Sequence, residues 1–188
     1  MTEPHDASPP PPPSAAVAGQ VKGYEELPLT ALPQFPMLAR CHQAWLAAHR
    51  GDRLPAAIEM DTLPAEVLPY TMLLDYLPAQ RDVRVRLAGN YVGERTSADD
   101  GGRRLGNFFN AHDAAIVFAS MEQVAGRRQA SLARRAYVLL DGSQLSYVRL
   151  ILPLSLDGQT VTGFFKTIEP DSLVREPVAG ADAVSAQP

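Results

Sequence analysis

The sequence predicts an α+β fold, with helices packed on one face of a five-stranded antiparallel sheet. The first observation behind this prediction is a series of three β-rich segments separated by Asp-Gly pairs, which supply the positive backbone angles of tight hairpins. The segments cover 131–140, 145–154 and 160–168, and the pairs are Asp141-Gly142 and Asp157-Gly158. The second observation is the order of elements, because two earlier strands and a helical middle precede this meander.

The first expected element is a leader helix over 37–50. Apolar residues recur there at helical spacing, while Pro36 suits the start of a helix and Gly51 its end. The apolar stripe consists of Leu38, Cys41, Trp45 and Ala48. A proline-punctuated link follows, in which we expect one short helix after Pro64.

Strands are expected at 71–77 and 82–88, and the second alternates cleanly between apolar and charged residues. Val83, Val85 and Leu87 fall on one face of this strand, with Arg84 and Arg86 on the other. Beyond it we expect loops and helices. A short helix should run from Tyr91 to about Ser97, and a longer one from Asp113, its expected N-cap, towards Gly126.

Composition predicts one domain at 36–169 between disordered tails at 1–35 and 170–188. The tails are acidic and the chain's formal net charge is −4, which leaves the domain near neutral and without the basic face that binds nucleic acid. No secretory signal opens the sequence and no apolar stretch approaches the ~20 residues of a membrane helix. We therefore expect a cytoplasmic protein that binds neither nucleic acid nor membranes.

Four short motifs follow one another along 36–169: CHQAWLAAHRGDRLPAAIEMD, LPAEVLPYTMLLDYLP, DVRVRLAGNYVGE and RRLGNFF. Their order, and the order of strands and helices, resemble a family of short, mostly stand-alone bacterial PAS-like proteins. The sequence departs from the family pattern at Asn90, where threonine is common, and in the long polar loop 96–102. The resemblance implies a PAS-like five-stranded sheet in a sensory or regulatory module that signals by protein–protein contact. Such modules hold a small ligand between sheet and helices, or hold none.

Catalytic and metal-binding chemistry is not expected. Cys41 lies on the apolar stripe of the leader helix, where a buried thiol is the simplest interpretation. The histidines are scattered, and His42 and His49 are about two helical turns apart, ~10 Å, too far to share one metal ion.

Haem and flavin are both disfavoured as cofactors. His112 is the only histidine near the helical middle, where haem-binding PAS domains place their iron ligand. An exposed or hydrogen-bonded histidine at the helix start, beside Asp113, is the favoured interpretation. A flavin photosensor needs a reactive cysteine in the same region, and Cys41 lies elsewhere. The identity of any ligand stays open.

The expected pocket lies on the sheet face that carries Val83, Val85 and Leu87, because the arginines between them point away. By alternation, Val148, Leu150 and Leu152 of the last strands are expected on the same face, with Tyr147 and Arg149 opposite. Phe165 is assigned to this face because its neighbour Lys166 is expected to point outward. Arg103 and Arg104 flank a loop over the pocket mouth. They either clamp a carboxylate or phosphate, as the guanidinium fork allows, or belong to a solvated loop, which is favoured.

A homodimer is expected to form through the leader helix and the outer sheet face. The expected interface residues are Leu38, Cys41, Trp45, Tyr147 and Ile151. An alternative of nearly equal weight is that the helix folds back onto its own sheet and buries Trp45. The functional alternatives are a ligand-binding sensor with an unidentified signalling partner and a ligand-free protein-interaction or localisation module, with an enzyme ranked last.

Overall fold

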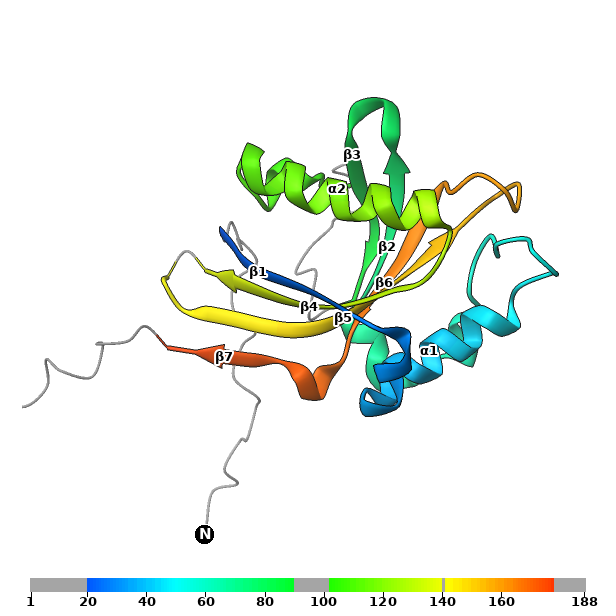
Figure 1. The fold of residues 1–188 in the computed structure, drawn as a ribbon, viewed down its shortest axis with the longest axis horizontal. Helices are drawn as coiled ribbons and strands as arrows, with labels where there is room; N and C mark the ends of the chain where they lie inside the picture. The colour runs from blue at the N-terminus through cyan, green and yellow to red at the C-terminus, as the bar shows by residue number, and fades with distance from the viewer. Residues whose placement is uncertain (1–19, 90–101, 140, 178–188) are drawn as a thin grey trace, which may run out of the picture.

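A computed structural model describes residues 20–89, 102–139 and 141–177 (Figure 1). Its seven strands and two α-helices form an α+β domain, as the sequence predicts, but the sheet has two strands more than the five expected. In chain order these are β1 (Gln20–Leu27), α1 (Pro36–Ala47), β2 (Thr71–Leu77), β3 (Asp82–Ala88), α2 (Ala111–Arg127), β4 (Ser131–Val138), β5 (Gln144–Leu154), β6 (Gly163–Ile168) and β7 (Val174–Glu176). Short 3₁₀ helices include η1 (Leu29–Gln34), η3 (Ala65–Tyr70) and η6 (Leu105–Asn107). No helix in the described ranges is long and apolar enough to cross a membrane.

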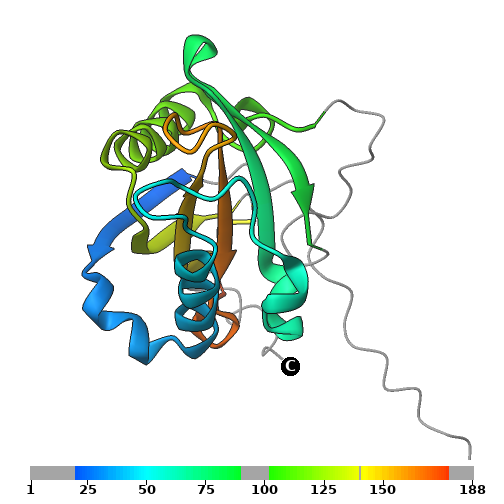
Figure 2. The ribbon, with the colours of Figure 1, turned by 90° about the vertical axis from the view of Figure 1, so that its right-hand side faces the viewer.

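The strands make one antiparallel sheet in the order β1-β4-β5-β6-β2-β3, with β7 paired to the start of β5. Figure 2 shows β1 at one edge and the β2–β3 hairpin at the other. The predicted meander of β4, β5 and β6 is confirmed. Gly142 and Gly158 have the expected positive φ angles, 79° and 77°. The second connection is longer than predicted, however, because β6 begins at Gly163 and not at Thr160.

Helices cover both faces of the sheet, so the prediction of helices on one face is wrong. Leu150 and Ile151 are neighbours on β5, point to opposite faces and are both fully buried. α2 covers the face of Ile151, where Phe118 stacks on Tyr76. α1, η1 and η3 pack on the face of Leu150. The two α-helices lie on opposite sides of the sheet in Figure 1.

The leader helix α1 packs on its own sheet. Leu38, Cys41 and Trp45 are buried, and the Trp45 indole N–H donates a 3.0 Å hydrogen bond to the Pro153 carbonyl. Burial raises the pKa of the Cys41 thiol to about 12. The apolar stripe that was expected to form a dimer interface is therefore occupied within the chain, in the alternative arrangement. Homodimerisation stays a prediction, but these three residues are not available for it.

The folded domain extends beyond both of its predicted boundaries. Residues 20–35, assigned to the leader, form β1 and η1, and β1 pairs with β4 along its length. Residues 170–177, assigned to the tail, include β7. The rest of the predicted tails, the helix expected at 91–97, Asn90 and most of the loop 96–102 lie outside the described residues.

The N-cap of α2 is Asn110 and not Asp113. The Asn110 side chain accepts a hydrogen bond of 2.9 Å from the Asp113 backbone N–H, which satisfies one of the free donors at the helix start. The Asp113 carboxylate instead accepts the backbone N–H of Val21 at 3.3 Å. It therefore connects the start of α2 to the edge strand β1.

A Trp45→Ala variant should lower the free energy of unfolding by ~3–5 kcal/mol, because it removes a buried indole and its hydrogen bond. Urea unfolding followed by circular dichroism measures the loss. Leu46→Ala is the matched control, since Leu46 is exposed on the same helix. A Trp45→Ala protein of unchanged stability that dissociates from dimer to monomer would contradict this packing of α1.

Candidate functional site

A cavity of about 180 Å³ lies between the sheet and α2. Val83 and Val85 of β3 line it from the sheet, and Val117 and Met121 line it from the helix. The segment that precedes α2 closes one side with Leu105 and Phe108. Most of the walls are apolar, as in small-molecule sites generally.

One wall of the cavity is a series of stacked rings. Phe109 stacks on Tyr137 with ring centroids 5.9 Å apart, and Tyr137 stacks on Tyr147 at 5.8 Å. Burial, together with the neighbouring Tyr137 hydroxyl, raises the pKa of Tyr147 well above its ordinary value. Tyr147 therefore stays neutral at physiological pH.

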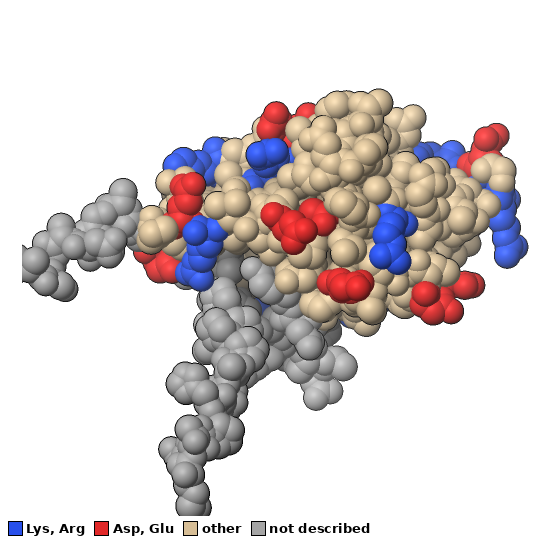
Figure 3. All heavy atoms as spheres, turned by 90° about the horizontal axis from the view of Figure 1, so that it is seen from below, with Lys and Arg blue, Asp and Glu red and all other residues tan. Residues whose placement is uncertain are grey.

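Three cationic side chains share the cavity face: Arg135 of β4, Arg149 of β5 and Lys166 of β6. We call them the inner cation cluster. Strand register puts them on one face, because Arg135 lies opposite Tyr147 and Lys166 lies opposite Ile151. The two arginines are each 2% exposed, and Lys166 is half-buried. On the face of the molecule seen in Figure 3, by contrast, acidic and basic side chains are interspersed.

The inner cation cluster has few partners within the described residues. One terminal nitrogen of Arg135, Nη2, donates to the Ser120 hydroxyl at 2.8 Å, and the guanidinium carbon lies 4.3 Å from the centre of the Tyr24 ring. The Arg135 Nε and Nη1 atoms and both terminal nitrogens of Arg149 are buried without a hydrogen-bond partner. The Lys166 ammonium lies 6.0 Å from the centre of the Tyr147 ring. Among the described residues, none of the ion pairs includes a member of the cluster.

Burial, and after it the repulsion between like charges, lowers the pKa values of Arg149 and Lys166. Burial and then the charge of Arg135 lower the pKa of Arg149 to about 10. Burial and then the charges of Arg149 and Arg135 lower the pKa of Lys166 to about 7. An unpaired buried cation costs several kcal/mol. An anion placed among these side chains would therefore remove an electrostatic penalty as well as gain hydrogen bonds.

Two of the predicted pocket residues of β3, Val83 and Val85, line the cavity, but Leu87 does not. The register between β2 and β3 shifts after Leu73, so that Leu87 lies opposite Leu73, on the face away from α2, and is half exposed. A bulge of this kind moves every later side chain to the other face.

The pocket residues predicted from the last strands lie on the wrong face of the sheet. Val148, Leu150, Leu152 and Phe165 are buried on the α1 side. Their neighbours Tyr147 and Ile151, predicted to form an outer interface, are buried under α2, as is Arg149. The expectation that Arg149 and Lys166 point away from the pocket is wrong, because both cationic side chains line the cavity.

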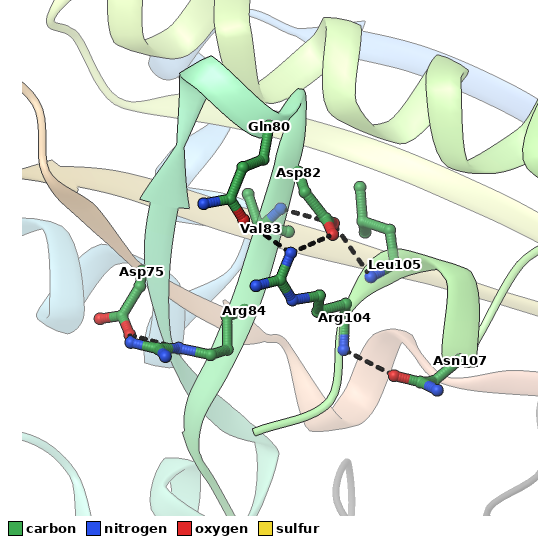
Figure 4. Close-up of polar contacts among 8 residues, drawn as sticks. All are labelled: Asp75, Gln80, Asp82, Val83, Arg84, Arg104, Leu105 and Asn107. Atoms are coloured by element: carbon green, nitrogen blue, oxygen red, sulfur yellow. Dashed lines mark hydrogen bonds and ion pairs between the residues drawn. The ribbon is translucent and has the colours of Figure 1, made fainter. Parts of the chain in front are cut away.

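The structure places the two loop arginines beside β3. Arg104 lines the cavity mouth, where its Nη1 atom donates to Gln80 at 2.7 Å and lies 3.5 Å from the Asp82 carboxylate (Figure 4). The backbone carbonyl of Arg103 accepts the Val85 N–H at 2.8 Å, and its guanidinium lies over the Phe108 ring at 5.9 Å. Asp82 also accepts the backbone N–H groups of Val83 and Leu105, so it connects the mouth segment to the sheet.

The residues considered for cofactor chemistry lie away from the cavity. His112 is exposed on the first turn of α2 and does not line the cavity. Cys41 is a buried residue of α1, on the opposite side of the sheet. The described ranges contain no group of three histidine, cysteine, aspartate or glutamate side chains placed to hold a metal ion.

Comparison of the chain with protein-family models, curated proteins and solved structures finds no match. The interpretation of the cavity therefore depends on its own geometry and charge.

The feature that the sequence analysis does not predict is the inner cation cluster. The available signal was the spacing of Arg135, Arg149 and Lys166 within three paired strands, where each lies one or two residues from an aromatic side chain.

A Lys166→Met variant should abolish part of the pH dependence of stability. The pKa of Lys166 in the folded protein is about 7, below the ~10.4 of an exposed lysine. Between these two pH values the unfolded state binds more protons than the folded state. The free energy of unfolding should therefore rise with pH across that window. Methionine removes the titrating group and should flatten the rise. Urea unfolding of refolded, anion-free protein between pH 7 and pH 9.5 measures it. Lys22→Met, at an exposed lysine, should retain the wild-type slope, and equal slopes in all three proteins would refute the assignment.

Proposed function

We propose that the protein is a non-catalytic, PAS-like sensory module that binds a small molecule between the sheet and α2 and signals through protein contact. The chain order supports the PAS-like part of this proposal, since two strands, a helical segment and a three-stranded meander follow one another from β2 to β6. β1 and β7 are additions to that five-strand plan.

The proposal depends most on the guanidinium nitrogens of Arg135 and Arg149 that have no hydrogen-bond partner among the described residues. Buried polar groups in folded proteins almost always have hydrogen-bond partners, and those that do not call for a specific explanation. Here Arg135 and Arg149 both line a cavity large enough for a compact molecule, and these nitrogens are buried in its walls. A bound ligand accounts for both the space and the missing partners.

β6 offers a direct route from the cavity to the opposite side of the sheet. Lys166 and Ile168 line the cavity, and the next residue, Glu169, is buried against α1. Its carboxylate accepts the backbone N–H groups of Met37 at 3.1 Å and Leu38 at 3.2 Å, at the start of that helix. A shift of β6 on ligand binding would therefore move α1, whose outer surface is then the proposed output to a partner protein or to a second copy.

A Val117→Phe variant should reduce ligand binding by filling the cavity from the α2 side. Native mass spectrometry of protein purified without added ligand should detect a bound small molecule on the wild-type chain and little or none on this variant. Ile116→Phe, one residue away and partly exposed, should retain the bound mass.

Circular dichroism must show that both variants are folded. A wild-type protein that carries no additional mass and is not stabilised by any small molecule, yet captures a partner protein, would contradict the proposal. That result would favour a ligand-free interaction module.

A further inference from the structure

We propose that the ligand is a small organic carboxylate, with its charged group on the inner cation cluster and its apolar body against β3 and α2. This inference depends on the proposed function, since it names the chemical class that the same cavity takes. It follows from three properties of the site: the geometry of the free donors, the apolar walls and the volume.

Arg149 has the donor geometry that a carboxylate needs. Both of its terminal nitrogens are buried and have no hydrogen-bond partner in the described part of the chain, and together they form the planar fork that binds two carboxylate oxygens side by side. Arg135 is already held by Ser120 and by the Tyr24 ring, so it remains in place and offers its other nitrogens from the neighbouring strand. Lys166 adds a third positive charge from the opposite side of β5.

The rest of the cavity fits a compact apolar body. Beyond the cations the walls are valine, leucine, methionine and aromatic side chains, which offer few hydrogen bonds to a polar ligand. The volume of about 180 Å³ is below the ~300 Å³ at which drug-sized ligand pockets begin. A single ring or a short aliphatic chain fits this space, whereas a nucleotide does not. An inorganic anion would leave the apolar walls without contacts.

The charge of the ligand should dominate its affinity. An amide has the shape of the corresponding carboxylic acid but no negative charge, so it would leave the cluster unneutralised. Each hydrogen bond to a charged group contributes enough to change affinity by ~10- to 100-fold. We therefore expect carboxylates to bind at least ~10-fold more tightly than their amides.

The test is isothermal titration calorimetry at pH 7 on the full chain, with benzoate and hexanoate, their amides benzamide and hexanamide, and inorganic phosphate. At least one carboxylate should bind, its amide should bind at least ~10-fold more weakly, and phosphate should bind more weakly than the carboxylate. Arg149→Met should reduce carboxylate affinity at least ~10-fold and remove most of the preference over the amide.

Arg134→Met is the matched control, because Arg134 is the neighbour of Arg135 on β4 but is exposed on the opposite face. Its affinities should equal those of the wild type. Arg149→Met should remain folded, since replacing an unpaired buried cation by an apolar side chain relieves an electrostatic cost. If it does unfold, Arg149→Lys provides the second variant, because it keeps the charge but loses the fork and should still bind carboxylate more weakly.

The outcomes separate this inference from the proposed function. A neutral molecule that occupies the cavity and binds equally well to Arg149→Met overturns the carboxylate assignment and leaves the sensory module intact. Binding of phosphate in preference to every carboxylate also overturns it. A wild-type protein that binds none of these compounds and carries no small molecule in native mass spectrometry overturns both.

Discussion

Three cations on adjacent strands share one enclosed face of the sheet, and the described residues supply no carboxylate to neutralise them. Arg135 and Arg149 are almost completely buried, and the half-buried Lys166 lines the same cavity. Such an arrangement is unfavourable in an empty protein, because each charge has lost water and repels the others. It becomes favourable when an anion completes it. The cavity, the stacked tyrosines around it and the helix α2 that covers it are all consistent with the binding of an anion.

The opposite face of the sheet provides the stability that this arrangement needs. Leu132, Leu150, Leu152 and Phe165 are each at most 1% exposed there and pack beneath α1, η1 and η3. Each residue of β5 from Tyr147 onwards is buried, alternately on the α1 side and on the α2 side of the sheet, where Tyr147 and Arg149 line the cavity. Glu169 follows the cavity strand β6 and accepts hydrogen bonds from the start of α1, so it connects the two faces of the sheet.

Much of the fold could be predicted from the sequence because it depends on local patterns. The strands at 71–77 and 82–88 have the expected bounds, and the Asp-Gly turns produce the meander. The cavity side of β4–β6 could not be predicted in the same way. Apolar residues occupy both faces of β5, so alternation alone does not say which face meets α2, and it places Arg149 on the wrong face.

The sequence does not reveal β1, because this strand has little apolar surface and depends on backbone pairing with β4. The bulge that turns Leu87 away depends on the register with β2, which is not a local property.

The most direct measurement is a crystal structure of the protein with 4-bromobenzoate, in which anomalous scattering locates the bromine. The account predicts the bromine between β3 and α2, near Val85 and Met121, with both carboxylate oxygens within hydrogen-bond distance of the Arg149 terminal nitrogens. A carboxylate side chain of the chain itself bound to Arg149, or an Arg149 side chain turned towards bulk water, would contradict it. Either result would mean that the inner cation cluster needs no ligand.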